Sequence, residues 1–522
     1  MRFLIVWMVL LFGAGCSMGG ATSAVSFSPE KLVRRAETYC EKGRYLEALS
    51  FYRDIYRNAW NGGVAAPLLK GLGDLYYFYL ADGPAALELY RKFCADYPAD
   101  KRLPDVYRAM AKIYYARSDR QQAEALYKRI LKGFPDFFVA NNLAHELLEL
   151  EKGGGLLDDV TLSLDRTLPQ YVRVLIVEGA RPVEVSATGA FGVYTPEQLF
   201  VKKKTGARVV VSARGSRVCL DGKPTAAGSM RLTAEAGGLL RMDGRTYRGF
   251  FWVYADDDDV IIINHVGLES YLYGVLPREV SPSWPQQALQ AQAVAARTYA
   301  LYHMLKRETK TYDVFSTTSS QVYGGHDNEA VAAQRAVDAT RGLIVAHADK
   351  VALTLYHSNS GGTTEASASV WGAQHTYLQS REDAFSRDRP GFSWSKSIGR
   401  DDITRKLQAF GLPVTDVTDI RVQSRSGSGR AVLLDIVQTP SEKSFTLSGN
   451  SFRLIVGAGK VRSTNFTVER KRDRFVFSGS GFGHGVGMSQ WGAYAMAKSG
   501  SVYTEILGFY YPETSLTRIT VL

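Results

Sequence analysis

Glu279 is the carboxylate in this 522-residue sequence whose surroundings best suit acid–base chemistry. It lies in the loop LPREVSPSWP, between prolines and beside the apolar residues Leu276, Val280 and Trp284. Apolar surroundings raise the pKa of a carboxyl group and keep it protonated near neutral pH, as a general acid requires. A loop glutamate taken alone is usually a solvated surface residue, so this interpretation depends on the elements that position Glu279.

Arg297 lies on a predicted helix that follows this loop. Pro285 suits the first turn of a helix, and one apolar stripe recurs at helical spacing, made of Leu289, Ala293, Ala296, Ala300 and Met304. Arg297 borders the stripe, and a charge beside a buried face requires a carboxylate partner.

A predicted apolar strand leads to His357 in the segment HSNSGGTTE. Its polar and glycine residues suit hydrogen bonds to sugar hydroxyls or a backbone turn; they include Ser358, Ser360, Gly361 and Gly362. A serine–histidine nucleophile pair is not favoured, because no nucleophile-elbow motif is present.

The segment GSGFGHGVGMSQWGAYA places His484 among glycines at every second position, including Gly483 and Gly485. In a strand, one face of this segment would be bare backbone. Such a face either lets a ligand lie close to the backbone or packs against another part of the chain. Gln490 and Trp491 then begin a predicted helix. The spacing is not G-x-G-x-x-G, so a dinucleotide site is not supported.

The N-terminal segment MRFLIVWMVLLFGAGC has the pattern of an export signal, and its small residues before Cys16 are typical of a lipoprotein. A plain secretory signal cut after Ala24 is the alternative. The net charge of +11 favours an anionic partner, or else reflects a solvated surface. Export argues against nucleic acid as that partner.

The chain resembles the SpoIID/LytB-domain proteins of the bacterial cell wall. The residues that carry the resemblance are YLYGVLPREVSPSWP, QALQAQAVAARTYAL, HSNSGGTTE with VWG, and GSGFGHGVGMSQWGAYAMAKSG with ILGFYYPET. The resemblance implies a lytic transglycosylase that cleaves the MurNAc–GlcNAc bond of peptidoglycan glycan strands stripped of stem peptides. It implies Glu279 as catalytic acid and Arg297 as a residue important for activity, either orienting Glu279 or, as we favour, contacting substrate. We also predict substrate contacts from the two histidine segments, Gln490 and Trp491.

One departure from the family pattern concerns zinc. Some members hold zinc with the loop histidine and two cysteines, but the matching positions here are Thr363 and Ser369. We therefore predict no metal and no cofactor, and a hydrogen-bonding or structural role for His357.

The predicted fold class is multidomain, with N-terminal all-α tetratricopeptide-like helical repeats followed by a mixed α+β SpoIID-type domain rich in β-strands. The repeats rest on RYLEALSFY, GPAALELYRKFCADYP and RQQAEALYKRILKGFP, and a generic helical bundle is their alternative. The predicted order is a signal segment at 1–24, repeats at 29–150, a linker at 151–164 and the SpoIID/LytB-like domain at 165–522.

The sequence is also compatible with a second function. The protein could be a non-catalytic wall-binding module that enhances an N-acetylmuramoyl-L-alanine amidase, with the repeats docking that partner. The presence of both Glu279 and Arg297 favours catalysis. An amidase in its own right is the weakest interpretation, because the sequence shows neither a metal trio nor an activated nucleophile.

Overall fold

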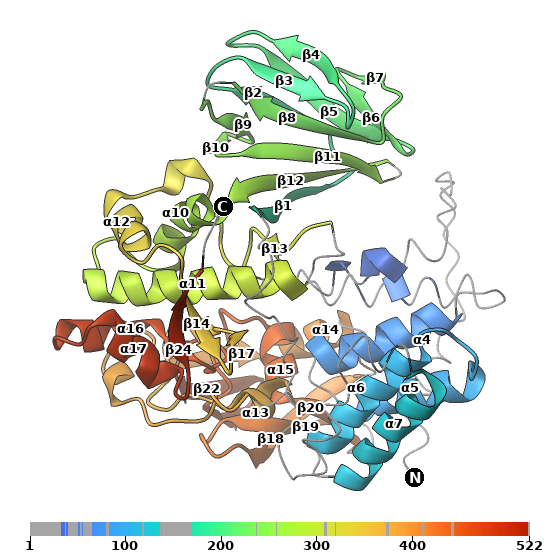
Figure 1. Cartoon of the computed structure of the whole chain (residues 1–522). Coiled ribbons are helices and arrows are strands. Elements are labelled where there is room, and N and C mark those ends of the chain that lie inside the picture. The colour runs from blue at the N-terminus through green and yellow to red at the C-terminus, as the bar shows by residue number, and fades with distance from the viewer. Residues whose placement is uncertain are drawn as a thin grey trace. The chain divides into compact units, whose positions relative to one another are not determined.

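The computed structural model describes most of the chain after residue 169 and parts of the chain before it (Figure 1). The described residues are 33–36, 38–39, 48, 51–52, 55, 65–79, 83–116, 119–135, 137, 170–235, 237–256, 258–306, 311–318, 320–371, 375–409, 412, 414–439 and 443–519. The predicted signal segment with Cys16 and the predicted linker at 151–164 lie outside them. The chain divides into a first unit, Met1–Asp158 with His357–Ser489, and a second unit, Asp159–Tyr356 with Gln490–Leu522.

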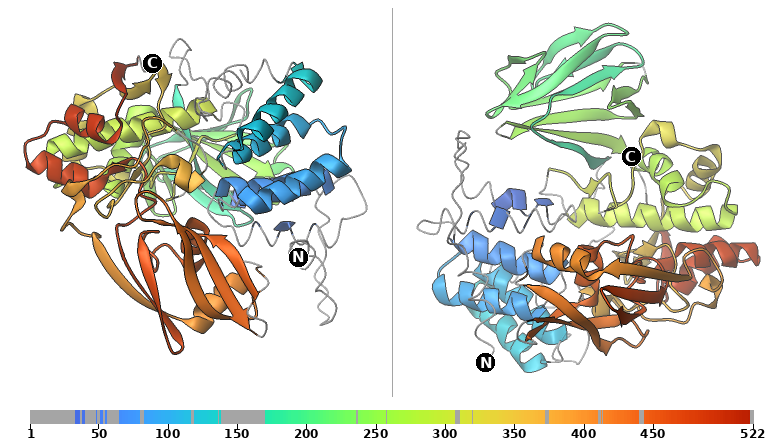
Figure 2. Two further views of the ribbon diagram at one scale, coloured as in Figure 1. Left: turned by 90° about the horizontal axis from the view of Figure 1, so that it is seen from below. Right: turned by 180° about the vertical axis from the view of Figure 1, so that it is seen from behind.

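The second unit contains two antiparallel-rich sheets that share one apolar core, drawn in green in Figures 1 and 2. One sheet has the order β13 (Val314–Phe315), β1 (Tyr171–Gly179), β12 (Asp259–Gly267), β11 (Phe250–Asp256), β8 (Ser229–Ala234), β3 (Phe191–Tyr194) and β4 (Leu199–Lys203). The other has the order β10 (Arg245–Tyr247), β9 (Leu240–Met242), β2 (Val183–Ala187), β5 (Arg208–Arg214), β6 (Arg217–Leu220) and β7 (Lys223–Pro224). Buried residues alternate along β2 and β8, as expected for strands with one face toward a core.

Two hairpin turns in this unit consist of Asp-Gly pairs. Asp221-Gly222 joins β6 to β7, and both residues have positive φ, +51° and +78°. Asp243-Gly244 joins β9 to β10 with φ of +50° and +74°. Positive φ at both central residues is the backbone that suits the twist of a two-residue hairpin, and Asp-Gly adopts it at little cost.

A helical layer follows β12 in the same unit. It contains α10 (Leu268–Glu279), α11 (Gln286–Lys306), α12 (Val331–Ala339), α16 (Gln490–Lys498) and α17 (Tyr503–Tyr510), with the small sheet β15 (Lys350–Val351), β14 (Leu343–His347), β24 (Ser515–Arg518). The predicted apolar stripe of α11 is buried, but the helix is buried on its other faces as well. Its many alanines allow other elements to approach closely from all sides, so α11 is the central helix of this layer rather than an amphipathic surface helix.

The first unit contains two further antiparallel sheets with short helices. Their orders are β17 (Ser393–Gly399), β22 (Arg474–Ser480), β21 (Phe466–Lys471), and β18 (Asp416–Arg425), β19 (Ala431–Thr439), β20 (Lys443–Ser448). The helices are α13 (Ser367–Trp371), α14 (Arg400–Ala409) and α15 (Gly449–Val456), and the short strands β16 (Tyr356–His357) and β23 (Met488–Ser489) complete the region.

The predicted fold class is wrong in its N-terminal part, because the structure does not support tetratricopeptide-like repeats. The helices described there are α4 (Ala65–Asp74), α5 (Gly83–Asp96), α6 (Leu103–Ala116) and α7 (Arg120–Gly133). A π-helical stretch at Leu75–Tyr79 continues α4, whereas regular repeats require uniform pairs of α-helices. The alanine and tyrosine positions behind the prediction are buried, but a small residue beside an aromatic ring suits close helix contacts in general. The pattern therefore does not identify this repeat.

None of the described helices is both long enough and apolar enough to cross a bilayer.

Candidate active site

Glu279 is the last residue of α10, so the prediction of a loop at this position is wrong, and the apolar core of the second unit holds this helix in place. Leu272, Val275 and Leu276 of α10 are fully buried. The Glu279 side chain is partly buried, and its Oε1 accepts a hydrogen bond from the backbone N–H of Val322 at 2.9 Å. The carboxyl group is therefore held in one orientation at the end of a rigid helix.

The surroundings of Glu279 favour its protonated form. Burial raises the pKa of this carboxyl above its ordinary value. Hydrogen bonds from Val322 N–H and from the Gln490 side chain, together with the charge of Arg278, oppose the rise without cancelling it. A carboxyl that keeps its proton at higher pH than free glutamate is suited to donate that proton to a leaving group.

The raised pKa of Glu279 predicts a pH-dependent gain in stability for Glu279→Gln. Ionised Glu279 destabilises the fold, and this cost is absent below the unfolded pKa of about 4.3, grows up to the folded pKa and is constant above it. We expect Glu279→Gln to unfold at a higher temperature than wild type at pH 7, with the difference shrinking as the pH falls toward 4.5. Thermal unfolding from pH 4.5 to 8 measures this, with the exposed Glu197→Gln as control. A difference independent of pH would contradict the prediction.

A buried polar cluster that the sequence analysis missed lies beside Glu279. Gln321 is fully buried and donates through Nε2 to the Tyr356 hydroxyl at 2.9 Å, and its Oε1 accepts from the Tyr271 hydroxyl at 3.1 Å. Burial raises the pKa of both tyrosines, and the charge of Glu279 adds to the rise in each. Both phenols therefore stay neutral near the carboxyl. Gln321 lies in the polar segment TTSSQVYGG, where no local pattern separates it from an ordinary loop residue.

Gln490 and Trp491, both predicted site residues, lie at the start of α16, close to Glu279. Gln490 contacts the Glu279 carboxyl. Trp491 packs against Trp284 of the loop between α10 and α11, with ring centroids 4.9 Å apart, and the ring centroid of Tyr494 lies 5.1 Å from that of Trp284. The three rings, named here the aromatic cluster, are each partly exposed.

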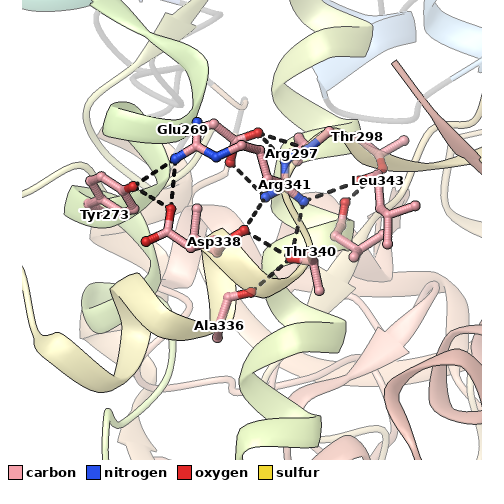
Figure 3. Close-up of polar contacts among 12 residues, drawn as sticks. Glu269, Tyr273, Arg297, Thr298, Ala336, Asp338, Thr340, Arg341 and Leu343 are labelled. Carbon is pink, nitrogen blue, oxygen red and sulfur yellow. Dashed lines mark hydrogen bonds and ion pairs between the residues drawn. The ribbon is translucent and has the colours of Figure 1, made fainter. Parts of the chain in front are cut away.

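Arg297 lies in a separate buried network (Figure 3). Its guanidinium pairs with both carboxylate oxygens of Glu269, at 2.9 and 2.7 Å. It also donates to the carbonyls of Val337 and Leu343, each at 3.1 Å, and to the Thr340 hydroxyl at 3.4 Å. The side chain is 0% exposed.

This geometry does not support the substrate contact that we favoured for Arg297. A guanidinium has five N–H donors, and the contacts to Glu269, Val337, Leu343 and Thr340 occupy all five. Glu269 is the carboxylate partner that a buried arginine requires. The network ties α11 to α10 and to the end of α12, and we therefore propose that Arg297 positions the helix that carries Glu279.

His357 and His484 lie together in the first unit, with ring centroids 5.6 Å apart. The Nδ1 of His357 is 3.1 Å from the Val486 carbonyl, which can only accept, so Nδ1 carries the proton. Burial, aided by His484 and Arg430, lowers the pKa of His357 well below its ordinary value. The neutral ring leaves its Nε2 as an acceptor that has no partner among the described residues. Trp371 of α13 stacks edge-on against His484, with centroids 5.1 Å apart.

The loop after His357 is held largely by contacts within the protein. The Ser360 hydroxyl donates to Asp383 at 2.7 Å, and Ser360 is fully buried. Gly361 and Gly362 have positive φ, +72° and +95°, and Ser358 is partly exposed. These residues shape the loop, and their predicted contacts with substrate stay predictions.

The alternating glycines do not form the expected strand with a bare face. Strand β22 ends at Ser480, and from there Gly481, Gly483, Gly485 and Gly487 all have positive φ, between +72° and +115°. A Cβ at Gly483 would lie 2.7 Å from the His357 Cβ, and one at Gly485 would lie 2.6 Å from the Arg430 guanidinium. Packing within the unit and left-handed backbone therefore account for Gly483 and Gly485, and access of a glycan to this backbone stays a prediction.

Gly485→Ala is expected to destabilise the first unit by about 1–3 kcal/mol, since an alanine there would adopt a strained backbone and contact Arg430. Chemical denaturation monitored by tryptophan fluorescence measures the change. Gly459→Ala is the matched control, because a Cβ there meets nothing within 4 Å. Equal stability of the two variants would show that the packing argument fails.

The described residues contain no group of three or more histidine, cysteine, aspartate or glutamate side chains placed to hold a metal ion. Independence from a cofactor stays a prediction from the residues at Thr363 and Ser369. The predicted site residues thus form two described clusters. Glu279, Gln490 and Trp491 lie in the second unit, with Arg297 supporting them, and His357, His484 and the glycines lie in the first.

Comparisons with known proteins match one family to part of the second unit and another to part of the first. Residues 256–347 match the SpoIID family, described as stage II sporulation protein, and residues 366–487 match a domain of unknown function, DUF8618. The chain is 35% identical over 273 residues to an uncharacterized protein of Brachyspira hyodysenteriae, covering 52% of this chain and 72% of that protein.

Two named relatives come from Bacillus subtilis. The amidase enhancer is 31% identical over 290 residues, which cover 47% of this chain but only 40% of the enhancer. Stage II sporulation protein D is 26% identical over 271 residues, covering 49% of this chain and 76% of that protein. Together with the motifs that surround Glu279, these matches show that the chain belongs to the SpoIID/LytB-type family of cell-wall proteins.

Proposed function

We propose that this protein is a lytic transglycosylase that cleaves the MurNAc–GlcNAc bond of peptidoglycan glycan strands lacking stem peptides. The observation that carries the proposal is the Glu279 carboxyl. It has a raised pKa, is held by Val322 N–H at 2.9 Å, and lies near the aromatic cluster.

The reaction requires one carboxyl group that acts twice. Glu279 first donates its proton to the glycosidic oxygen as the bond to the muramic anomeric carbon breaks. The 6-hydroxyl of the same muramic residue attacks that carbon, and the Glu279 carboxylate accepts the hydroxyl proton. The products are a strand with a 1,6-anhydro-muramic end and a strand with a free GlcNAc 4-hydroxyl. Water is not consumed, so a second catalytic carboxylate of the kind used by hydrolases is unnecessary.

The contacts of Glu279 suit both halves of this cycle. Burial favours the protonated acid at the start, and the Val322 N–H stabilises the carboxylate formed midway. The neutral phenols of Tyr271 and Tyr356 surround the site with polar groups that carry no competing charge.

The aromatic cluster and the net charge support a glycan as substrate. Partly exposed rings such as Trp284 and Trp491 offer flat apolar surfaces that suit the C–H faces of sugars. A stripped glycan carries a lactyl carboxylate on each muramic residue, and the net charge of +11 attracts such a polyanion. The proposal includes export to the cell envelope and anchoring through a lipid on Cys16.

A second candidate function is enhancement of an amidase without catalysis. It is favoured by the 31% identity to the protein named amidase enhancer. In this case the protein would bind peptidoglycan and present it to a separate amidase, and Glu279 would be dispensable.

Incubating the purified protein with stripped glycan strands tests the two functions. Mass spectrometry of the products distinguishes 1,6-anhydro ends, expected from a lytic transglycosylase, from the reducing ends of a hydrolase. Parallel reactions with intact peptidoglycan and an amidase measure stimulation of stem-peptide release. Stimulation without anhydro products would refute the lytic proposal and support the enhancer.

A further inference from the structure

The first unit contains a small pocket that lies within the domain of unknown function, except for its edge at Glu365. The pocket has a volume of about 50 Å³, which is enough for a chemical group of a few heavy atoms. It is lined by residues of α13, β19, β20 and α15 and by residues of four loops; among them are Glu365, Arg430, Asn450, Thr464 and His484.

Arg430 is the unusual residue of this lining. It is 1% exposed, and only its Nη2 has an acceptor, the Ser360 carbonyl at 2.5 Å, with the Thr363 carbonyl at 3.5 Å. Its Nε and Nη1 have no acceptor among the described residues. Three of the five N–H donors of a buried cation are thus unsatisfied, whereas all five are occupied in Arg297. Unpaired buried donors of this kind destabilise a fold unless a ligand or water satisfies them.

The charges around Arg430 leave a positive surplus. Arg453 of α15 is also buried, and the charge of Arg430 adds to the burial that lowers the pKa of Arg453 to about 10. The one buried carboxylate on the pocket wall, Glu365, already accepts hydrogen bonds from the hydroxyls of Ser426 at 2.5 Å and Ser428 at 2.7 Å. An anion in the pocket would offset the two arginines and satisfy the free N–H groups.

We propose that this pocket binds a carboxylate group of a ligand, with Arg430 as its principal contact. A carboxylate is planar and small, and it accepts the N–H groups of arginine in directional hydrogen bonds. The nearby negative charge of Glu365 favours a singly charged carboxylate over a doubly charged phosphate or sulfate. Thr464 and Asn450 supply further polar contacts at the wall.

This inference concerns a site apart from Glu279 and does not depend on glycan cleavage. Two sources of the carboxylate exist in a bacterial cell wall, the lactyl group of muramic acid and the free carboxyl of a peptide. Both share the chemistry that Arg430 recognises, and defined small ligands separate them.

Calorimetric titration of the full-length protein tests the proposal. The ligands are N-acetylmuramic acid, with a free lactyl carboxylate, and muramyl dipeptide, whose lactyl group is amidated and whose carboxyl lies on the peptide. N-acetylglucosamine has no carboxylate, and inorganic phosphate is a divalent competitor. We expect saturable binding of at least one carboxylate ligand and none of N-acetylglucosamine. Comparing the two carboxylate ligands identifies the source.

Variants locate the binding. Arg430→Lys and Asn450→Tyr, the second of which fills the pocket without removing Arg430, should each weaken carboxylate binding about 10- to 100-fold. Arg421→Gln, an exposed arginine on the adjoining strand β18, is the control and should bind as wild type does. Circular dichroism confirms folding, and Asn450→Tyr keeps the test valid if Arg430→Lys does not fold.

Several outcomes would overturn this inference. They are failure of every carboxylate to bind wild type, equal binding of N-acetylglucosamine, preference for phosphate, and wild-type binding by Asn450→Tyr. Glu279→Gln should bind as wild type does, because Glu279 is no part of this pocket. Loss of catalysis and loss of carboxylate binding are therefore separable.

Discussion

Glu279→Gln is expected to abolish detectable release of 1,6-anhydro-muramic products from stripped glycan strands, a loss of about 10²- to 10⁴-fold. Glutamine has the same size and can still accept the Val322 N–H bond, so the fold and the substrate contacts are retained. What it lacks is the proton that must reach the leaving oxygen. Liquid chromatography with mass spectrometry of the soluble products, at matched protein concentration, measures the effect.

Two further variants sharpen this experiment. Glu279→Asp keeps an acid but shortens its reach, so we expect partial activity, below wild type and above Glu279→Gln. Glu197→Gln removes an exposed carboxylate of the same unit and should leave activity unchanged. If Glu279→Gln released anhydro products at the wild-type rate, Glu279 would not be the acid, and the single-carboxyl mechanism would have to be abandoned.

Arg297→Met is expected to lower the free energy of unfolding of the second unit by about 3–5 kcal/mol. The substitution leaves the Glu269 carboxylate buried and unpaired, and it also removes hydrogen bonds to two carbonyls, those of Val337 and Leu343 (Figure 3). Arg297→Lys keeps the charge but cannot reproduce the five-donor geometry, so we expect an intermediate loss. Denaturant titration of the full-length variants, followed by circular dichroism, measures these differences.

The double variant Arg297→Met with Glu269→Leu separates a positioning role from a catalytic one. Removing both charges takes away the unpaired carboxylate, so much of the lost stability should return. If Arg297 acts only by positioning α11 against α10, activity per folded molecule should return along with it. A stable but inactive double variant would instead show that Arg297 takes part in the reaction directly.

The local features of the second unit could be predicted from the sequence. The two Asp-Gly pairs form hairpin turns because these residue types adopt a positive-φ backbone at little cost. Helix α11 begins after Pro285, and its alanine-rich stripe is buried as its spacing requires. The direction of the pKa shift of Glu279 was also predicted, and burial is its largest cause.

The wrong predictions of repeats and of a bare strand share one cause. The contacts that determine each structure join residues that are far apart in the chain. Alanine and tyrosine at regular spacing indicated repeats, but such pairs suit helix packing in general and do not specify how many helices follow or how they stack. The glycines after Ser480 indicated a bare strand, whereas their backbone is left-handed and their neighbours are His357 and Arg430. Alternation alone does not reveal the sign of φ.

The sequence by itself determined the chemical types at the candidate active site: an acid among apolar residues, an amide and aromatic rings on the following segments, and an arginine in need of a carboxylate. Only the tertiary structure decided which partners these groups have. It paired Arg297 with Glu269, placed Gln321 between two tyrosines, and left three N–H donors of Arg430 without an acceptor among the described residues. Burial and hydrogen bonding depend on segments that meet only after folding, and for that reason a residue's type can be read along the chain while its role cannot.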